Sequence, residues 1–256
     1  MTVYCLNVEL GAPVSASDPY IHLDSFLSYA SAVDELGYEG LDELEDSGEP
    51  DYFEDSMPLA QYEIDGEWVW AASSASIADP DADEFEDMSD NDRWSITRWR
   101  TRFDNDPEHQ IKNTHVQTKS GPFKSYNAAL PYSGVDNLDF YFEVADENEP
   151  EEVLDLIEEY VPAIGKKRTQ GFGEIQDVKL CEAATVESAI LHDQRILRTF
   201  PNQFIDGTVK NVPYQARTVR PPYWHQDNQV EGGAVPPFAQ IYRDDFKDAL
   251  IEQVVQ

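Results

Sequence analysis

The sequence predicts an α+β fold in which two helices cover one face of an antiparallel sheet. Two segments carry apolar residues at helical spacing, several others alternate as strands do, and one pair of strand-like segments is joined by a turn dipeptide. The order is strand, helix, hairpin, long insertion, strand, helix, strand. With 256 residues, of which 41% are hydrophobic, the chain can bury a sizeable core.

The first half supplies a strand, a helix and a hairpin. Residues 3–10 are expected to form the strand and residues 22–36 the helix, whereas the acidic segment 38–56, with its Gly and Pro, reads as a surface loop. Residues 58–75 predict a hairpin, because Asp65-Gly66 supplies the positive φ angles of a tight turn. The helix stripe is Leu23, Phe26, Leu27, Ala30 and Val33.

The second half repeats the strand–helix–strand pattern. Residues 137–145 alternate as a strand, residues 149–164 form an amphipathic helix with Pro150 near its start, and residues 174–183 form a closing strand. We expect Gly165 to cap this helix. The residues after 184 are irregular and rich in proline, except for an amphipathic segment at 244–255.

This order matches a ferredoxin-like βαββαβ unit with long acidic insertions. We expect residues 1–184 to form that domain, with insertions at 38–56 and 76–136. Residues 185–256 would form a C-terminal extension packed on it. The sheet face opposite the helices would be free for a ligand.

The net charge of −33 has three competing explanations: mimicry of nucleic acid, cation binding, and life in high salt. We favour high salt, because acids are spread through most segments and no regular Ca²⁺ loop occurs. In molar salt the Debye length is about 3 Å, so self-repulsion is screened. A halophilic cytoplasm is the expected location.

Several kinds of site are not expected. The sequence has no CxxC, no HExxH and no nucleophile motif, so we predict no metal and no cofactor. No apolar segment is long enough to span a membrane. The two cysteines, Cys5 and Cys181, are interpreted as reduced core residues in strands.

Basic residues are concentrated outside the first 92 residues, which hold 25 acids and no Lys or Arg. One basic cluster is the segment 165–173, GKKRTQGFG, which follows the second helix. Its bases and its paired glycines suit binding of a phosphate backbone, although a helix cap with dipole-complementing lysines is the simpler explanation. The residues of interest are Lys166, Lys167, Arg168, Thr169, Gln170, Gly171, Phe172 and Gly173.

Two further clusters combine bases with aromatic residues. The segment 93–103, RWSITRWRTRF, suits phosphate contacts and stacking, and it also reads as an amphipathic helix that buries its aromatic side chains. The third cluster, RILRTFPNQF at 195–204 followed by YQARTVRPPYW at 214–224, reads as a docking segment packed on the core or as a pair of arginines that contacts a nucleic-acid backbone. The candidate RNA-binding bases in these clusters and the loop between them are Arg98, Arg102, Lys119, Lys124, Arg198 and Arg220.

One histidine is a candidate for catalysis. His22 lies at the start of the first predicted helix, where it would act as a general base for RNA cleavage. A structural role at a helix start is the more common one, and we therefore assign no catalytic residue.

Five segments in this order and spacing resemble a known family, the crRNA 5′-handle-binding (five-type) RAMP subunit of type IV CRISPR effector complexes. The likeness covers roughly residues 1–225. The segments are IHLDSFLSYA (21–30), MPLAQYEIDGEWVWAASSA (57–75), SGPFKSY (120–126), GKKRTQGFGEI (165–175), and RTFP (198–201) with RPPYW (220–224).

The resemblance implies a RAMP core with a glycine-rich loop and a noncatalytic, guide-RNA-binding role in antiviral defence. It implies crRNA, a backbone RAMP, a large subunit and target DNA near the PAM as partners. It places Lys124 at the basic position of the central loop, and His22 and Asp24 in the helix-start motif. The alternatives are an endoribonuclease that processes precursor crRNA and an acidic structural or viral protein that binds no nucleic acid.

Overall fold

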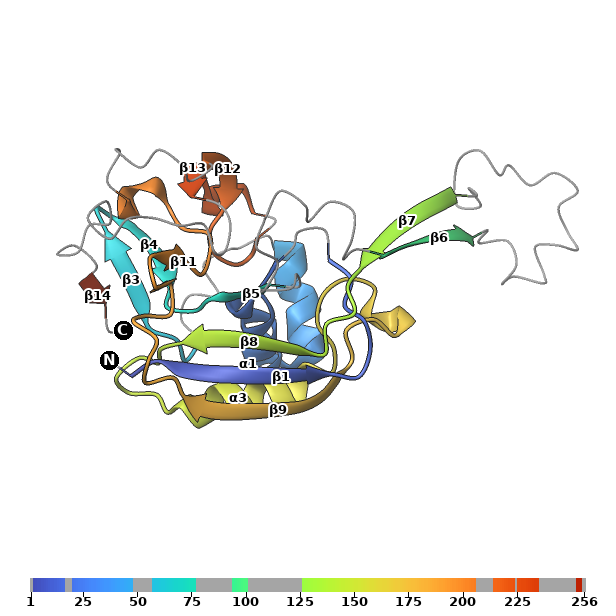
Figure 1. Cartoon of the computed structure of the whole chain (residues 1–256), viewed down its shortest axis with the longest axis horizontal. Helices are drawn as coiled ribbons and strands as arrows, with labels where there is room; N and C mark the ends of the chain where they lie inside the picture. Colours follow the sequence, from blue (N-terminus) through green and yellow to red (C-terminus); the bar gives the residue numbers. More distant parts are fainter. Residues whose placement is uncertain are drawn as a thin grey trace, which may run out of the picture.

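Three antiparallel strands form the central sheet, in the order β8 (Asn137–Phe142), β1 (Tyr4–Leu10), β9 (Ile175–Glu182) (Figure 1). Together with two long helices they make the chain α+β, as predicted. The computed structural model describes residues 2–16, 20–47, 57–76, 94–100, 126–205, 214–223, 225–234 and 252–254.

The main core lies between this sheet and the helices. Alternate residues of β1, Leu6 and Val8, are fully buried, and the predicted Leu138, Phe140 and Phe142 of β8 face the same side. They pack against α1 (Leu23–Ser47) and α3 (Pro150–Tyr160). Both helices therefore cover one face of the sheet.

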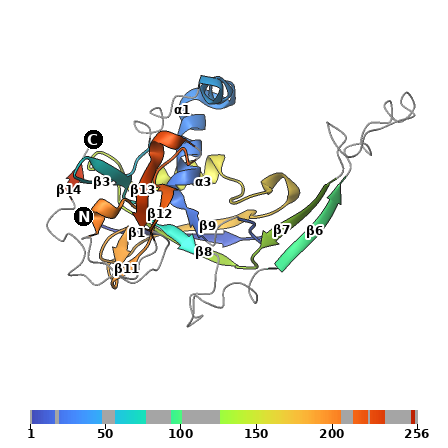
Figure 2. The same cartoon turned by 90° about the horizontal axis from the view of Figure 1, so that it is seen from above.

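Helix α1 is longer than predicted. It includes residues 38–47, which we expected to be a loop, and bends at Gly37, whose φ of 68° is not helical. Figure 2 shows the far end of α1 turned away from its first part. Leu41 of the second part is buried against Ala32 and Val33, so a tertiary contact supports the extension.

Helix α3 matches its prediction at the start and ends earlier. Pro150 occupies the first turn, and Glu149 and Glu152 form a reciprocal capping box. The cap is Val161, four residues before Gly165, so the expected capping role of Gly165 is wrong. Gly165 instead has a φ of 81° in the following loop.

The predicted hairpin is present as β3 (Gln61–Ile64) and β4 (Glu67–Trp70), with Asp65 and Gly66 both at positive φ. A second apolar cluster joins it to the C-terminal part through Ile190, Phe200 and Phe204. The other C-terminal elements are β10 (Leu191–His192), β11 (Arg195–Ile196), η5 (Asn202–Phe204), β12 (Tyr214–Thr218), η6 (Gln226–Asn228), β13 (Gln229–Ala234) and β14 (Glu252–Val254).

Two more strand pairs complete the described fold. Strand β2 (Tyr20–His22) pairs with β5 (Ser74–Ser76), and β6 (Trp94–Arg100) pairs with β7 (Tyr126–Tyr132). The helical interpretation of 93–103 is therefore wrong for residues 94–100, which form a strand. The β6–β7 ribbon projects from the body of the molecule in both views (Figures 1 and 2).

The sheet face opposite the helices is polar. Asn7 donates to Asp139 at 2.6 Å, and Lys179 pairs with Asp177 at 3.0 Å. Cys5 and Cys181 face each other across β1 and β9 as free thiols. Cys5 is buried as predicted, whereas Cys181 is exposed, so its placement in the core was wrong. No helix of the described residues is both long and apolar enough to cross a membrane.

Candidate functional site

The glycine-rich segment 165–173 forms a tight loop between α3 and β9. Gly165, Lys167, Gly171 and Gly173 all have positive φ, and Arg168–Gln170 form a short 3₁₀ turn, η4. A Cβ on Gly173 would lie 2.0 Å from the carbonyl oxygen of Ile164, whereas one on Gly171 would meet nothing within 4 Å. Gly173 is thus required by packing, and Gly171 by its backbone angle.

The ends of the loop are held, and its basic residues are displayed. The Gly173 amide donates to the carbonyl of Pro13 at 2.9 Å, and the Lys166 amide donates to that of Ser15. The side chains of Lys166, Lys167, Arg168 and Thr169 are exposed, and Gln170 is half-buried. The backbone of the loop is therefore held at both ends, and its three basic residues are exposed.

Two aromatic contacts connect this loop to its neighbours. The Arg168 guanidinium lies 5.8 Å from the centroid of the Tyr29 ring on α1, within cation–π range. The Phe172 ring lies 6.0 Å from that of Tyr132, the last residue of β7. The loop therefore sits where α1, β9 and the projecting ribbon meet.

A pocket of about 390 Å³ lies beside the loop and brings together residues that are far apart in the sequence. Lys166 lines it together with His22 and Arg217, so the loop and the predicted histidine share one site. The other lining residues are Ala16, Tyr20, Ile21, Ser25, Thr218 and Tyr223. Two cations and one imidazole on a common wall suit an anionic ligand such as a phosphate.

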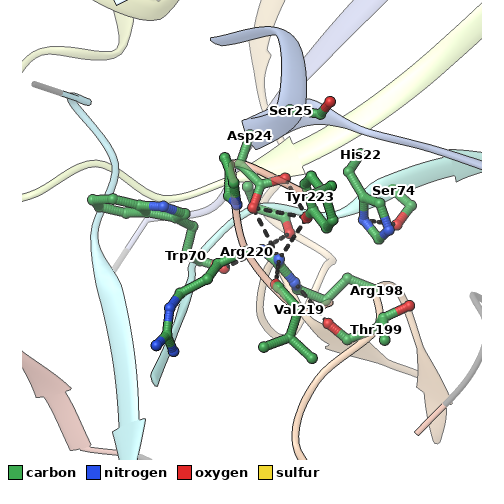
Figure 3. Close-up of polar contacts among 12 residues, drawn as sticks. His22, Asp24, Ser25, Trp70, Ser74, Arg198, Thr199, Val219, Arg220 and Tyr223 are labelled. Atoms are coloured by element: carbon green, nitrogen blue, oxygen red, sulfur yellow. Dashed lines mark hydrogen bonds and ion pairs between the residues drawn. The ribbon is translucent and has the colours of Figure 1, made fainter. Parts of the chain in front are cut away.

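His22 is held firmly in this pocket. Its Nδ1 lies 2.8 Å from the Ser74 hydroxyl, and its ring stacks on Tyr223 with centroids 4.8 Å apart (Figure 3). Burial lowers the pKa of His22 well below its ordinary value, and the charges of Arg198 and Arg217 lower it further. The imidazole is therefore neutral at neutral pH, able to accept a hydrogen bond.

Arg198 lies behind the pocket, completely buried, rather than at the predicted RNA surface. Figure 3 shows its guanidinium bonded to Asp24 at 2.9 Å and to the carbonyl of Val219 at 2.6 Å. It also donates to the carbonyls of Trp70, Ala72 and Thr199. With every nitrogen used internally, Arg198 is a structural residue, and its predicted RNA contact is wrong.

The same network fixes the pocket wall. The Tyr223 hydroxyl donates to Asp24 at 2.9 Å, so the ring that stacks on His22 is anchored to α1. Burial raises the pKa of the Asp24 carboxyl, while Arg198 and Tyr223 oppose that rise. Burial by itself would lower the pKa of the Arg198 guanidinium. The combined effect of Asp24 and Tyr223 is larger, so the pKa is raised.

The structure describes only some of the other basic residues that were predicted to bind RNA. Arg220 lies over the Trp68 ring at 4.5 Å and donates to Asn228, so most of its side chain is used internally. Arg98 lies in β6, and nothing about its side chain is described. Arg102, Lys119 and Lys124 fall outside the described residues.

Sequence reasoning missed Arg217 and Tyr20 as parts of the site. Arg217 is three residues before Arg220 in a basic segment, and only the pairing of β12 with β13 shows which arginine reaches the pocket. Within the described part of the chain, no group of three or more His, Cys, Asp or Glu side chains could hold a metal ion.

Comparison with known families supplies the identity. No match was found among curated protein sequences. The profile of one family, described as CRISPR type IV associated protein Csf3, matches residues 5–234. The match includes the central sheet, both helices, the glycine-rich loop and the His22 pocket. The chain therefore belongs to the Csf3 family of type IV CRISPR-associated proteins.

Proposed function

We propose that this chain is a noncatalytic, guide-RNA-binding subunit of a type IV CRISPR effector ribonucleoprotein. It holds the crRNA 5′ handle on a surface made by the glycine-rich loop and the His22 pocket. A backbone RAMP and a large subunit are its protein partners, and target DNA near the PAM lies close by. Family membership supports the type IV context of this proposal.

The arrangement of the sheet supports a ferredoxin-like RAMP core. Helix α3 connects β8 to β9, and these two strands flank β1. Residues 71–73 bond to the free edge of β8, where the second strand of such a core would lie. The glycine-rich loop then follows the second helix of the core, as in the RAMP pattern.

One observation carries the RNA-binding proposal: an exposed run of three bases continues into a pocket that holds a neutral imidazole and a further arginine. Phosphate backbones are recognised by Lys and Arg side chains together with backbone amides. The rings of Tyr20 and Tyr223 pack against the His22 ring and hold it in this pocket.

The opposite face of the sheet is a poor candidate for RNA. It presents Glu9, Asp139 and Asp177, and its one lysine, Lys179, bonds to two of these carboxylates. A phosphate backbone would be repelled there. We therefore expect the RNA to lie on the loop side, and not on the open sheet face that the sequence suggested for a ligand.

Neutralising the loop tests this proposal. We expect Lys167→Gln with Arg168→Gln to weaken binding of a repeat-derived RNA that carries the 5′ handle. Each lost phosphate contact with a single strand lowers the slope of log Kd against log[KCl] by about 0.7, so the double variant loses about 1.4. Fluorescence anisotropy at several KCl concentrations measures both quantities.

A matched control removes two exposed bases elsewhere. Lys179→Gln with Arg195→Gln makes the same charge change on the open sheet face and on β11, and should leave the slope unchanged. Equal losses in the two double variants would mean that RNA responds only to net charge, and the proposed interface would be wrong.

A second candidate function is cleavage of precursor crRNA, which the neutral His22 in a cationic pocket favours. A general base must be unprotonated, and the lowered pKa of His22 meets that condition but also makes the imidazole a weaker base. The RNA recovered from the same binding assay separates the two functions. Intact RNA supports a binding subunit, whereas fragments that disappear with His22→Ala support the nuclease.

A further inference from the structure

A second cavity, of about 530 Å³, lies between α1 and α3 and shares no lining residue with the His22 pocket. Its walls come from both helices, from residues 57–59 and from residues 145–148. The lining residues are Ser31, Asp34, Glu35, Met57, Pro58, Leu59, Ala145, Glu147, Asn148, Glu152, Asp155, Leu156, Glu159 and Tyr160. The proposed RNA interface leaves this cavity unused.

The cavity is strongly acidic. Six carboxylates line it, and none of the described lining residues is Lys, Arg or His. Asp34 accepts from the Tyr160 hydroxyl at 2.7 Å, and Glu152 accepts from Asn148 at 3.0 Å. The other four carboxylates belong to exposed residues on both helices and the adjoining loop. The cavity therefore favours a cationic occupant.

Ser31 gives an independent indication of a ligand. This residue of α1 is 3% exposed, and its hydroxyl has no hydrogen-bond partner in the protein. A buried hydroxyl without a partner costs about 1–3 kcal/mol. Because Ser31 lines the cavity, a bound donor would supply the partner that the protein does not.

The floor of the cavity is apolar. Met57 and Leu59 are buried, Leu156 is half-buried, and the Tyr160 ring stands beside them. Such a surface suits the methylene chain of a long side chain or amine, and an aromatic ring attracts a nearby cation. A hydrated metal ion would gain nothing from it.

The spacing of the carboxylates also argues for an elongated cation. Within the described ranges, no three His, Cys, Asp or Glu side chains are close enough together to hold a metal ion. Acidic groups are instead distributed around an apolar floor, from Glu35 on α1 to Asp155 and Glu159 on α3. This pattern fits separated charges joined by hydrocarbon.

We propose that the α1–α3 cavity binds an alkylammonium group, with the ammonium among the carboxylates, the methylene chain on the apolar floor and an N–H donated to Ser31. Two sources have this chemistry: a free polyamine, and a lysine side chain of a partner protein. The site is independent of the RNA interface, so the loop variants leave it intact.

Isothermal titration calorimetry on the full chain at fixed ionic strength tests the site. The probes are spermidine and Nα-acetyl-lysine methylamide. We expect saturable binding of at least one probe, and a loss of at least about tenfold in affinity in Asp155→Asn with Glu159→Gln, since two charge-assisted contacts are removed. Neither residue takes part in the helix cap, and the Tyr160 hydroxyl, which also interacts with Glu159, keeps its hydrogen bond to Asp34 in this variant.

The control variant, Glu151→Gln with Glu158→Gln, removes two charges from the same helix but outside the cavity, and should bind within about twofold of the native affinity. Ser31→Ala should weaken binding severalfold without lowering the thermal midpoint, because its hydroxyl has no internal partner. Circular dichroism verifies that each variant is folded.

The two probes also separate the sources. Tighter binding of spermidine assigns the cavity to a free polyamine, and tighter binding of the lysine derivative assigns it to a partner's side chain. Equal losses of affinity in the cavity variant and its control would show that binding depends only on general surface charge, which would overturn the proposal. Absence of saturable binding by both probes would overturn it as well.

Discussion

Arginine residues that look alike in the sequence have very different environments in this protein. Arg195 is exposed on β11, Arg198 is completely buried, and Arg217 lines the His22 pocket. Arg198 has a set of acceptors that uses all three of its guanidinium nitrogens. Its position joins the start of α1 to the hairpin and to the C-terminal part.

Arg198→Met is therefore expected to destabilise the protein by about 3–5 kcal/mol, because Asp24 would remain as a buried charge without its partner. Urea unfolding measures this change. Arg195→Met, three residues away and exposed, should stay within about 0.5 kcal/mol of the native value. A similar small loss for both variants would contradict the structural role of Arg198.

At the scale of elements, the strongest patterns were read correctly. Helix α3, strands β1, β8 and β9, and the turn at Asp65-Gly66 follow from apolar spacing and turn chemistry. The strand at 94–100 was misread in one interpretation as a helix, because a short aromatic run fits both periods. Its partner lies at 126–132, a pairing that local spacing does not show.

The glycine-rich loop allows a prediction about an element. Gly173→Ala should destabilise the protein by several kcal/mol, since a φ of 67° costs about 1–2 kcal/mol and the new Cβ would collide with the Ile164 carbonyl. Gly171→Ala meets open space and should cost only the backbone penalty of about 1–2 kcal/mol at its φ of 86°. Urea unfolding of both variants compares them, and equal costs would show that packing at Gly173 is unimportant.

The whole molecule has an uneven charge distribution. The first 92 residues, which contain no base, supply α1 and two of the six carboxylates of the acidic cavity, whereas the loop and the pocket draw their bases from residues 166–217. A net charge of −33 on one domain-sized chain produces strong self-repulsion. We propose that this composition is adapted to high salt.

Raising KCl from 0.1 to 1 M should therefore raise the urea midpoint of unfolding, because the Debye length falls from about 10 Å to about 3 Å. The expected increase should be steepest at low salt, where repulsion between carboxylates is least screened. Circular dichroism at each KCl concentration follows the transition. A midpoint that is independent of KCl would argue against adaptation to salt.

The sequence by itself determined the α+β class, the two amphipathic helices, the hairpin turn and the position of the basic loop, because these depend on local periodicity and on glycine or proline at particular positions. Only the tertiary structure decided that Arg198 is buried, that Arg217 and Lys166 share a pocket with His22, and that α1 continues past Gly37. Burial and proximity depend on which distant segments of the chain pack together, and the local spacing of residues in a single sequence contains little information about that packing.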